Sequence, residues 1–221
     1  MDLSDDFGKR RLNSLCKSHP EYSIIIAAAF NAVSRAYIEA REKMGPELLN
    51  DPLSSQRLGS CVKPCVDSNM SQTLEKINHP GIEVRRMPNS NRSEVHLEIW
   101  TSSAIFMVLK SSGNNHLPSP TKYRERYLRM HDYGTQSFFA FDEDITIREA
   151  PRNLYVITHT PSPGYVSVSH WEIGTPSPSQ NSWDFHASLD DFTADVPAEN
   201  IVKVQPEERI AKIPIKLKII D

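Results

Sequence analysis

Two hydrophobic patterns in the middle of the chain constrain its fold most strongly. Over 94–99 and again over 183–189, apolar residues occupy every second position, which is typical of strands with one buried face. The segment 104–109 is apolar throughout, which predicts a central strand covered on both faces. Turn-forming residues separate these segments, so the pattern indicates a mainly antiparallel sheet.

Alternation also assigns side chains to the two faces of the predicted sheet. In the first strand the apolar residues should face the core, and His96 and Glu98 should face water. His170 and His186 fall on the polar sides of later strands. Three such strands side by side could bring the imidazoles together for metal binding or acid–base chemistry. The alternative is that each histidine is a solvated residue of its own strand.

Two helices are predicted before the sheet. The first covers 21–43, has one apolar face, and is stopped by the Gly-Pro pair at 45–46. The polar composition of residues 47–60 predicts a loop. The second helix should cover 63–77, with Pro64 in its first turn, where the missing N–H costs nothing.

The order of these elements predicts an α+β fold, in which N-terminal helices pack on a mainly antiparallel β-sheet. A helical segment over 1–50 should join an α+β domain over 51–221 in one compact unit. The alternating run at 212–219, with lysines and a proline on one side, predicts an edge strand.

Composition limits the classes of function. No apolar run approaches the roughly 20 residues that a membrane span needs, so no membrane partner is expected. The N-terminus is acidic and lacks the basic start of a secretory signal, which predicts a cytoplasmic protein. A net charge of −3 argues against a protein that coats nucleic acid along its whole surface, although a local basic patch is compatible with it.

Common catalytic and cofactor motifs are missing from the sequence. It has no Gly-x-Ser-x-Gly turn and no glycine-rich phosphate loop, so no catalytic residue and no cofactor is predicted. Cys61 and Cys65 could be half of a metal site, but no second pair has matching spacing, so no metal is predicted either. The segments 94–100 and 104–110 predict a first hairpin, and Glu94, Glu98 and Lys110 flank it without the compact Glu-x-Lys of a metal-dependent nuclease.

One short motif points to a protein partner. Gln136, Phe139 and Phe141 resemble the Gln-x-x-hydrophobic-x-Phe peptide with which bacterial proteins dock onto the replication sliding clamp. The glutamine would donate and accept hydrogen bonds, and the aromatic rings would anchor in an apolar pocket. The alternative is that the same aromatic residues belong to a core strand.

A second motif points to nucleic acid. Lys122, Arg124, Arg126 and Arg129 lie with two tyrosines in a short predicted helix. Guanidinium and aromatic groups together suit phosphate contact and base stacking. The arginines within 85–92 could extend this patch. The alternative is an ordinary solvated helix face with internal ion pairs.

The order of elements from 60 to 189 resembles that of the SocB-type bacterial toxins and related bacterial and phage proteins. The segments that carry the resemblance are Pro-Gly-Ile-Glu-Val at 80–84, Met-Val-Leu-Lys at 107–110, Asn-Leu-Tyr-Val-Ile at 153–157 and Trp-Asp-Phe at 183–185. The resemblance implies a small cytoplasmic toxin or host-takeover factor that binds a partner protein, such as replication machinery, without catalysis. The alternative function is a nucleic-acid-binding protein or nuclease that uses the basic helix.

Overall fold

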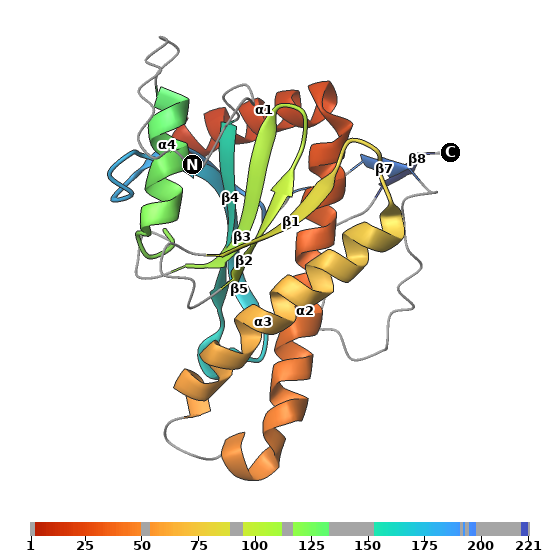
Figure 1. The fold of residues 1–221 in the computed structure, drawn as a ribbon, viewed down its shortest axis with the longest axis vertical. Helices are drawn as coiled ribbons and strands as arrows, with labels where there is room; N and C mark the ends of the chain where they lie inside the picture. Colours follow the sequence, from red (N-terminus) through yellow and green to blue (C-terminus); the bar gives the residue numbers. More distant parts are fainter. Residues whose placement is uncertain are drawn as a thin grey trace.

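The computed structural model describes residues 3–49, 54–88, 95–111, 117–132, 153–190, 192, 195–197 and 218–220. Within these residues, helices pack against a six-stranded sheet in an α+β fold (Figure 1). The predicted fold class, with N-terminal helices on a mainly antiparallel sheet, is confirmed.

The large sheet contains its strands in the order of the chain, β1-β2-β3-β4-β5-β6. The helices are α1 (Leu3–Ser18), α2 (Pro20–Leu49), α3 (Ser54–Ile77) and α4 (Lys122–Asp132), with a 3-10 turn at Pro163–Tyr165. The strands are β1 (Glu83–Pro88), β2 (Val95–Trp100), β3 (Ala104–Lys110), β4 (Asn153–Pro161), β5 (Val168–Pro176) and β6 (Trp183–Ser188). A separate parallel pair consists of β7 (Asp195–Pro197) and β8 (Lys218–Ile220).

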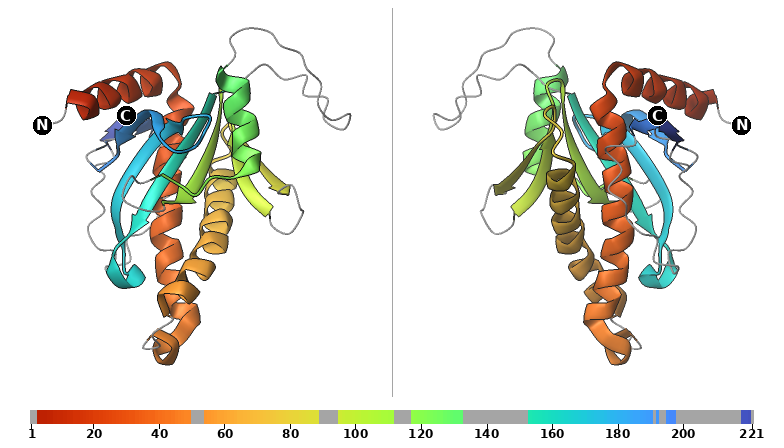
Figure 2. Two further views of the ribbon diagram at one scale, coloured as in Figure 1. Left: turned by 90° about the vertical axis from the view of Figure 1, so that its left-hand side faces the viewer. Right: turned by 90° about the vertical axis from the view of Figure 1, so that its right-hand side faces the viewer.

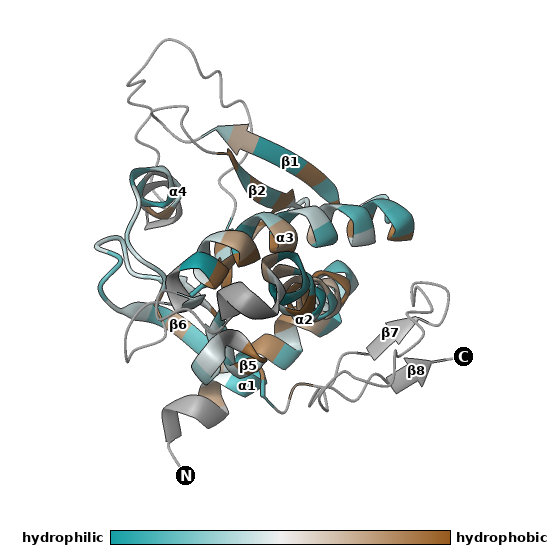
Figure 3. Cartoon of the chain, turned by 90° about the horizontal axis from the view of Figure 1, so that it is seen from below, coloured by the Kyte–Doolittle hydropathy of each residue, from teal (hydrophilic) through white to brown (hydrophobic). Residues whose placement is uncertain are grey.

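The parallel pairing of β3 with β4 determines where α4 lies. Parallel neighbours cannot be joined by a tight turn, so the chain crosses over one face of the sheet between them. In this crossover, Leu128 of α4 packs with Ile105, Met107, Leu154 and Val156. Seen from below, α4 lies on one side of the strands and α2 and α3 lie on the other (Figure 3). We call the side of α2 and α3 the first face and the side of α4 the second face.

The larger core lies between the first face and the helices α2 and α3, which run side by side (Figure 2). Small side chains on α2 let the neighbouring elements approach closely. Those that are fully buried there are Ala28, Ala29, Ala32, Ala36 and Ala40. Because β3 has buried residues in both cores, the prediction of a central strand covered on both faces is confirmed.

The prediction for the polar side of β2 is wrong. Glu98 is 0% exposed and His96 is 7% exposed, whereas Val95 is 53% exposed. Alternation correctly separates the residues of β2 into two sets. The set with polar side chains is buried because α4 covers the second face at this point.

Two predicted helix boundaries also need correction. Gly45 interrupts the helical geometry of α2 with a φ of 71°, a value that favours glycine, but helix resumes and ends at Leu49. Since α3 then begins at Ser54, the predicted loop over 47–60 is wrong. Pro64 lies inside α3 instead of at its start. Because proline has no backbone N–H, it removes one backbone hydrogen bond from the interior of the helix.

The helix α1 lies within the predicted helical segment over 1–50, although the sequence pattern delimits no separate helix before residue 21. It packs on the edge strand β6, with Gly8 against the backbone of His186, where any larger side chain would collide. Residues 137–141 and most of the predicted edge strand at 212–219 lie outside the described residues. Of the latter run, the structure describes 218–220 as β8. None of the described helices combines the length and apolar character needed to cross a bilayer.

A histidine is buried where α2 meets the sheet. His159 of β4 is 2% exposed, and its Nδ1 atom lies 2.9 Å from the hydroxyl of Tyr37. Burial lowers the pKa of His159 from 6.5 to about 3, and the Lys110 ammonium acts in the same direction. The folded protein therefore holds this imidazole neutral at acidic pH values where the unfolded chain would protonate it.

This difference predicts acid destabilisation. As pH falls from 6.5 toward 3, only the unfolded chain binds the proton, so His159 should reduce the free energy of unfolding by up to about 1.4 kcal/mol per pH unit. His159→Gln keeps an acceptor for Tyr37 and removes the titration. Urea denaturation between about pH 6.5 and pH 4 should show a shallower loss of stability for this variant than for the wild type or His186→Gln. Equal slopes for all three proteins would contradict the prediction.

Candidate functional site

Two His-x-Glu pairs occupy matching positions on the second face. His96 and Glu98 lie in β2, the middle strand of β1–β2–β3, and His170 and Glu172 lie in β5, the middle strand of β4–β5–β6. In each pair, Nε2 of the histidine faces Oε1 of the glutamate, at 2.8 Å in β2 and 3.2 Å in β5. We call these groups, with their neighbours, the Glu98 cluster and the Glu172 cluster.

The Glu98 cluster joins β2 to α4. Trp100 Nε1 donates to Glu98 Oε2 at 2.8 Å, and His96 Nε2 donates to Oε1. The hydroxyl of Tyr127, on α4, lies 3.0 Å from Oε1 and 3.1 Å from Oε2. Three donors therefore satisfy a carboxylate that has no contact with water, as a buried charged group requires.

Aromatic contacts surround this carboxylate. The His96 ring stacks on Tyr123 of α4 with 3.9 Å between ring centroids, and its Nδ1 atom is buried without a hydrogen-bond partner. The Arg85 guanidinium lies 4.0 Å from the centroid of the Trp100 ring, in cation–π geometry. Arg85 also forms two hydrogen bonds of 2.8 Å with Glu83. The arrangement fixes α4 on the second face and leaves the carboxylate oxygens facing protein donors.

The Glu172 cluster is more open. His170 Nδ1 lies 2.6 Å from Asp190 Oδ2, so both ring nitrogens face carboxylates. Glu172 Oε2 is buried without a partner, and so is the hydroxyl of Thr158, which lies directly opposite Glu172 on β4. Gly174 stands where β2 has Trp100, because a side chain there would collide with the backbone of Phe185. Glu172 therefore lacks the indole donor that Glu98 has.

The three predicted strand histidines share the second face but do not gather. His96 is separated from β5 by β3 and β4, so the expected side-by-side strands are not present. His170 and His186 lie on neighbouring strands, but His186 pairs with Gly174, four residues further along β5. Over the parts of the chain that the structure describes, no three His, Cys, Asp or Glu side chains come together as metal ligands.

A serine and a histidine meet elsewhere without forming a catalytic relay. Ser103 Oγ lies 3.4 Å from His19 Nδ1 and 2.9 Å from the hydroxyl of Tyr22. Glu21 Oε1 approaches the same His19 nitrogen, at 3.6 Å. In a catalytic triad the serine and the acid contact opposite nitrogens of the ring, so that one nitrogen takes the serine proton while the acid holds the N–H of the other. Here the two groups compete for one nitrogen.

Two described residues of the first hairpin, Glu98 and Lys110, lie on opposite faces of the sheet. Ala104, Phe106 and Val108 of β3 pack in the first-face core, so Lys110 continues that face. Glu98 lies on the opposite face, and Glu94 lies outside the described residues. A metal-dependent nuclease needs its carboxylates and lysine around one scissile phosphate.

The basic helix is only partly available for nucleic acid. Lys122 is exposed, but Arg124 is 2% exposed. The Arg124 guanidinium donates to the carbonyl of Ser119 and, at 3.1 Å, to Gln180 Oε1. The assignment of Arg124 to a phosphate-binding surface is therefore corrected, because its charge is turned into the protein. The side chains of Arg126 and Arg129 lie outside the described part of α4.

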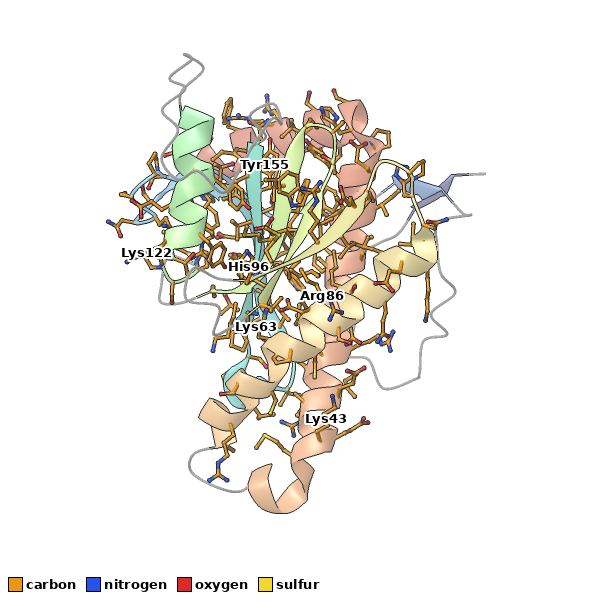
Figure 4. The ribbon with its side chains drawn as sticks, viewed as in Figure 1. Lys43, Lys63, Arg86, His96, Lys122 and Tyr155 are labelled. Atoms are coloured by element: carbon orange, nitrogen blue, oxygen red, sulfur yellow. The ribbon has the colours of Figure 1, made fainter. Side chains whose placement is uncertain are left out.

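The structure does bring basic groups from other elements near β2. Figure 4 labels Lys63 of α3, Arg86 of β1 and His96 of β2. Burial raises the pKa of Asp67 on α3, and the charges of Lys63, His96 and Arg86 act in the opposite direction. Lys63 also pairs with Asp67 at 3.0 Å and donates to the carbonyl of Val95.

The predicted docking motif and the cysteine pair add no further candidate site within the described residues. Gln136, Phe139 and Phe141 lie in 133–152, outside those residues. Cys65 is buried and accepts a 3.5 Å contact from Lys43 Nζ.

The comparisons with protein-family models, curated proteins and solved structures find no match to this chain.

The Glu98 cluster yields a stability prediction. Glu98→Gln exchanges an acceptor-only group for an amide that cannot accept from all three donors, which should lower the free energy of unfolding by about 1–3 kcal/mol. Tyr127→Phe removes one donor and should cost about 1 kcal/mol. Urea denaturation measures both effects, with the exposed Glu42→Gln as the matched control. Wild-type stability in Glu98→Gln would show that the carboxylate does not hold α4.

Proposed function

We propose that this protein acts by binding a partner macromolecule, without covalent chemistry of its own. The observation that carries this proposal is how the structure uses its histidines. The imidazole of His96 binds a buried carboxylate, that of His170 is held between two carboxylates, and that of His159 is sealed in the core beside a tyrosine. A general base needs a ring nitrogen directed at a substrate, and these rings are used to hold strands and helices together.

The partner that we propose is a bacterial protein, with the replication sliding clamp as the specific candidate. Gln136, Phe139 and Phe141 supply the hydrogen-bonding amide and the two aromatic anchors of a clamp-docking peptide. In the chain, these residues stand between α4 and β4, the two elements of the central crossover. The proposal includes a cytoplasmic protein of bacterial or phage origin, similar in action to the SocB-type toxins.

Binding of the full-length protein to a purified bacterial sliding clamp tests this proposal. The double variant Gln136→Ala/Phe141→Ala should weaken binding at least tenfold in isothermal titration calorimetry, because it removes the amide and one anchor. The matched control is Phe7→Ala, which removes an aromatic ring that is 66% exposed on α1. Undetectable wild-type binding would refute the clamp as partner, and equal affinity of the wild type and the double variant would refute Gln136 and Phe141 as the docking residues.

A second candidate function is binding of single-stranded nucleic acid. It is favoured by the aromatic and basic groups that β1, β2 and α4 bring to the second face. These are Arg85, which lies on the buried ring of Trp100, and the half-buried Tyr123 and Tyr127, with Lys122 exposed at the start of α4. Stacking and phosphate contact use such combinations. The ion pair between Arg85 and Glu83 argues against this function, because the Glu83 carboxylate offsets part of the positive charge of Arg85.

The salt dependence of oligonucleotide binding tests this second candidate. Affinity for a labelled single strand should fall steeply with salt, and Lys122→Ala/Arg126→Ala/Arg129→Ala should reduce both the affinity and the salt slope. Lys43→Ala is the control, since Lys43 lies on α2 away from α4 (Figure 4). An absence of binding at low salt, or equal losses in both variants, would reject this function.

A further inference from the structure

His170 bridges two carboxylates from different parts of the chain. Its Nε2 atom faces Glu172 on the same strand, and its Nδ1 atom faces Asp190, just after β6. A carboxylate accepts hydrogen bonds and cannot donate them, so both contacts are hydrogen bonds only when both ring nitrogens carry protons. The complete bridge therefore requires an imidazolium ion.

Glu172 depends on that positive charge. Its side chain is 10% exposed, and Oε2 is buried without a hydrogen-bond partner. The nearest cross-strand residues on this face are uncharged, namely Thr158 and Thr160 on β4 and Ser188 on β6. Among the described residues, Glu172 and Asp190 place carboxylate oxygens 3.2 Å and 2.6 Å from the ring nitrogens of His170. Loss of the imidazolium proton would leave a buried carboxylate poorly compensated.

Asp190 holds the turn at which the chain leaves the sheet. Its Oδ1 atom accepts from the backbone N–H of Trp171 at 3.0 Å, and its own N–H donates to Ser188 Oγ at 3.2 Å. The backbone N–H of Phe192 then donates to the carbonyl of Leu189, and both side chains are buried in the first-face core. Asp190 thus adds a side-chain bond to the backbone bond in which the N–H of Leu189 donates to the carbonyl of Trp171 at 3.0 Å.

We propose that His170, Glu172 and Asp190 form a pH-sensitive clasp that fixes this turn. While His170 is protonated, the imidazolium holds Asp190 against β5. When His170 gives up one ring proton, one of the two bonds is lost and the turn loosens. This inference does not depend on the proposed binding function.

Hydrogen exchange of the full-length protein, measured by NMR, tests the clasp. A protection factor corrects the exchange rate for its intrinsic dependence on pH. The protection factor of the Trp171 amide should fall about tenfold as His170 loses its proton. The loss should follow the ring 15N shifts of His170. His170→Gln should show the low protection at every pH, and His186→Gln should keep the wild-type profile.

Two results would overturn the clasp. One is a protection factor of Trp171 that stays constant in the wild type while the ring 15N shifts report loss of the His170 proton. The other is a wild-type pH profile in His170→Gln. If His170→Gln does not fold, the wild-type comparison of ring shifts with Trp171 protection still decides the question.

Discussion

The structure depends on one buried carboxylate. Glu98 lies in β2 with no exposure to water, and it is tolerated there because an imidazole, an indole and a phenol all reach it. The phenol comes from Tyr127, so the same carboxylate that requires donors also holds α4 on the second face. Without α4 in place, β2 would present an unsatisfied charge, and the apolar residues of β3 would lose their second-face cover.

The crossover and the Glu98 cluster support each other. Parallel pairing of β3 and β4 forces the chain across the second face, and Leu128 and Tyr127 attach α4 there by apolar and polar contacts. The Glu172 cluster has the same His-x-Glu pair but no equivalent of Trp100, since Gly174 is needed for close strand packing. One pair therefore serves as a fixed anchor, whereas the other belongs to the proposed clasp.

Sequence patterns predict the sheet well because alternation and turn residues are local properties. The hairpins, the central strand and the α+β class all follow from them. The burial of His96 and Glu98 could not be predicted, because alternation separates the two faces of a strand without showing what covers each. Arg124 illustrates the same limit, since its partners Ser119 and Gln180 depend on tertiary packing. The helical spacing of Tyr123 and Tyr127 was the available signal that α4 has an aromatic side to bury.

The most direct test of this account is hydrogen exchange of the indole N–H groups of the three tryptophans in one 1H–15N spectrum. If Glu98 is a sealed structural anchor, the Trp100 indole should exchange only when the protein unfolds, and more slowly than that of Trp183 on the edge strand β6. Exchange of the Trp100 indole as fast as that of Trp183 would mean that the Glu98 carboxylate is open to solvent. The second face would then be an accessible site, and the account would be wrong.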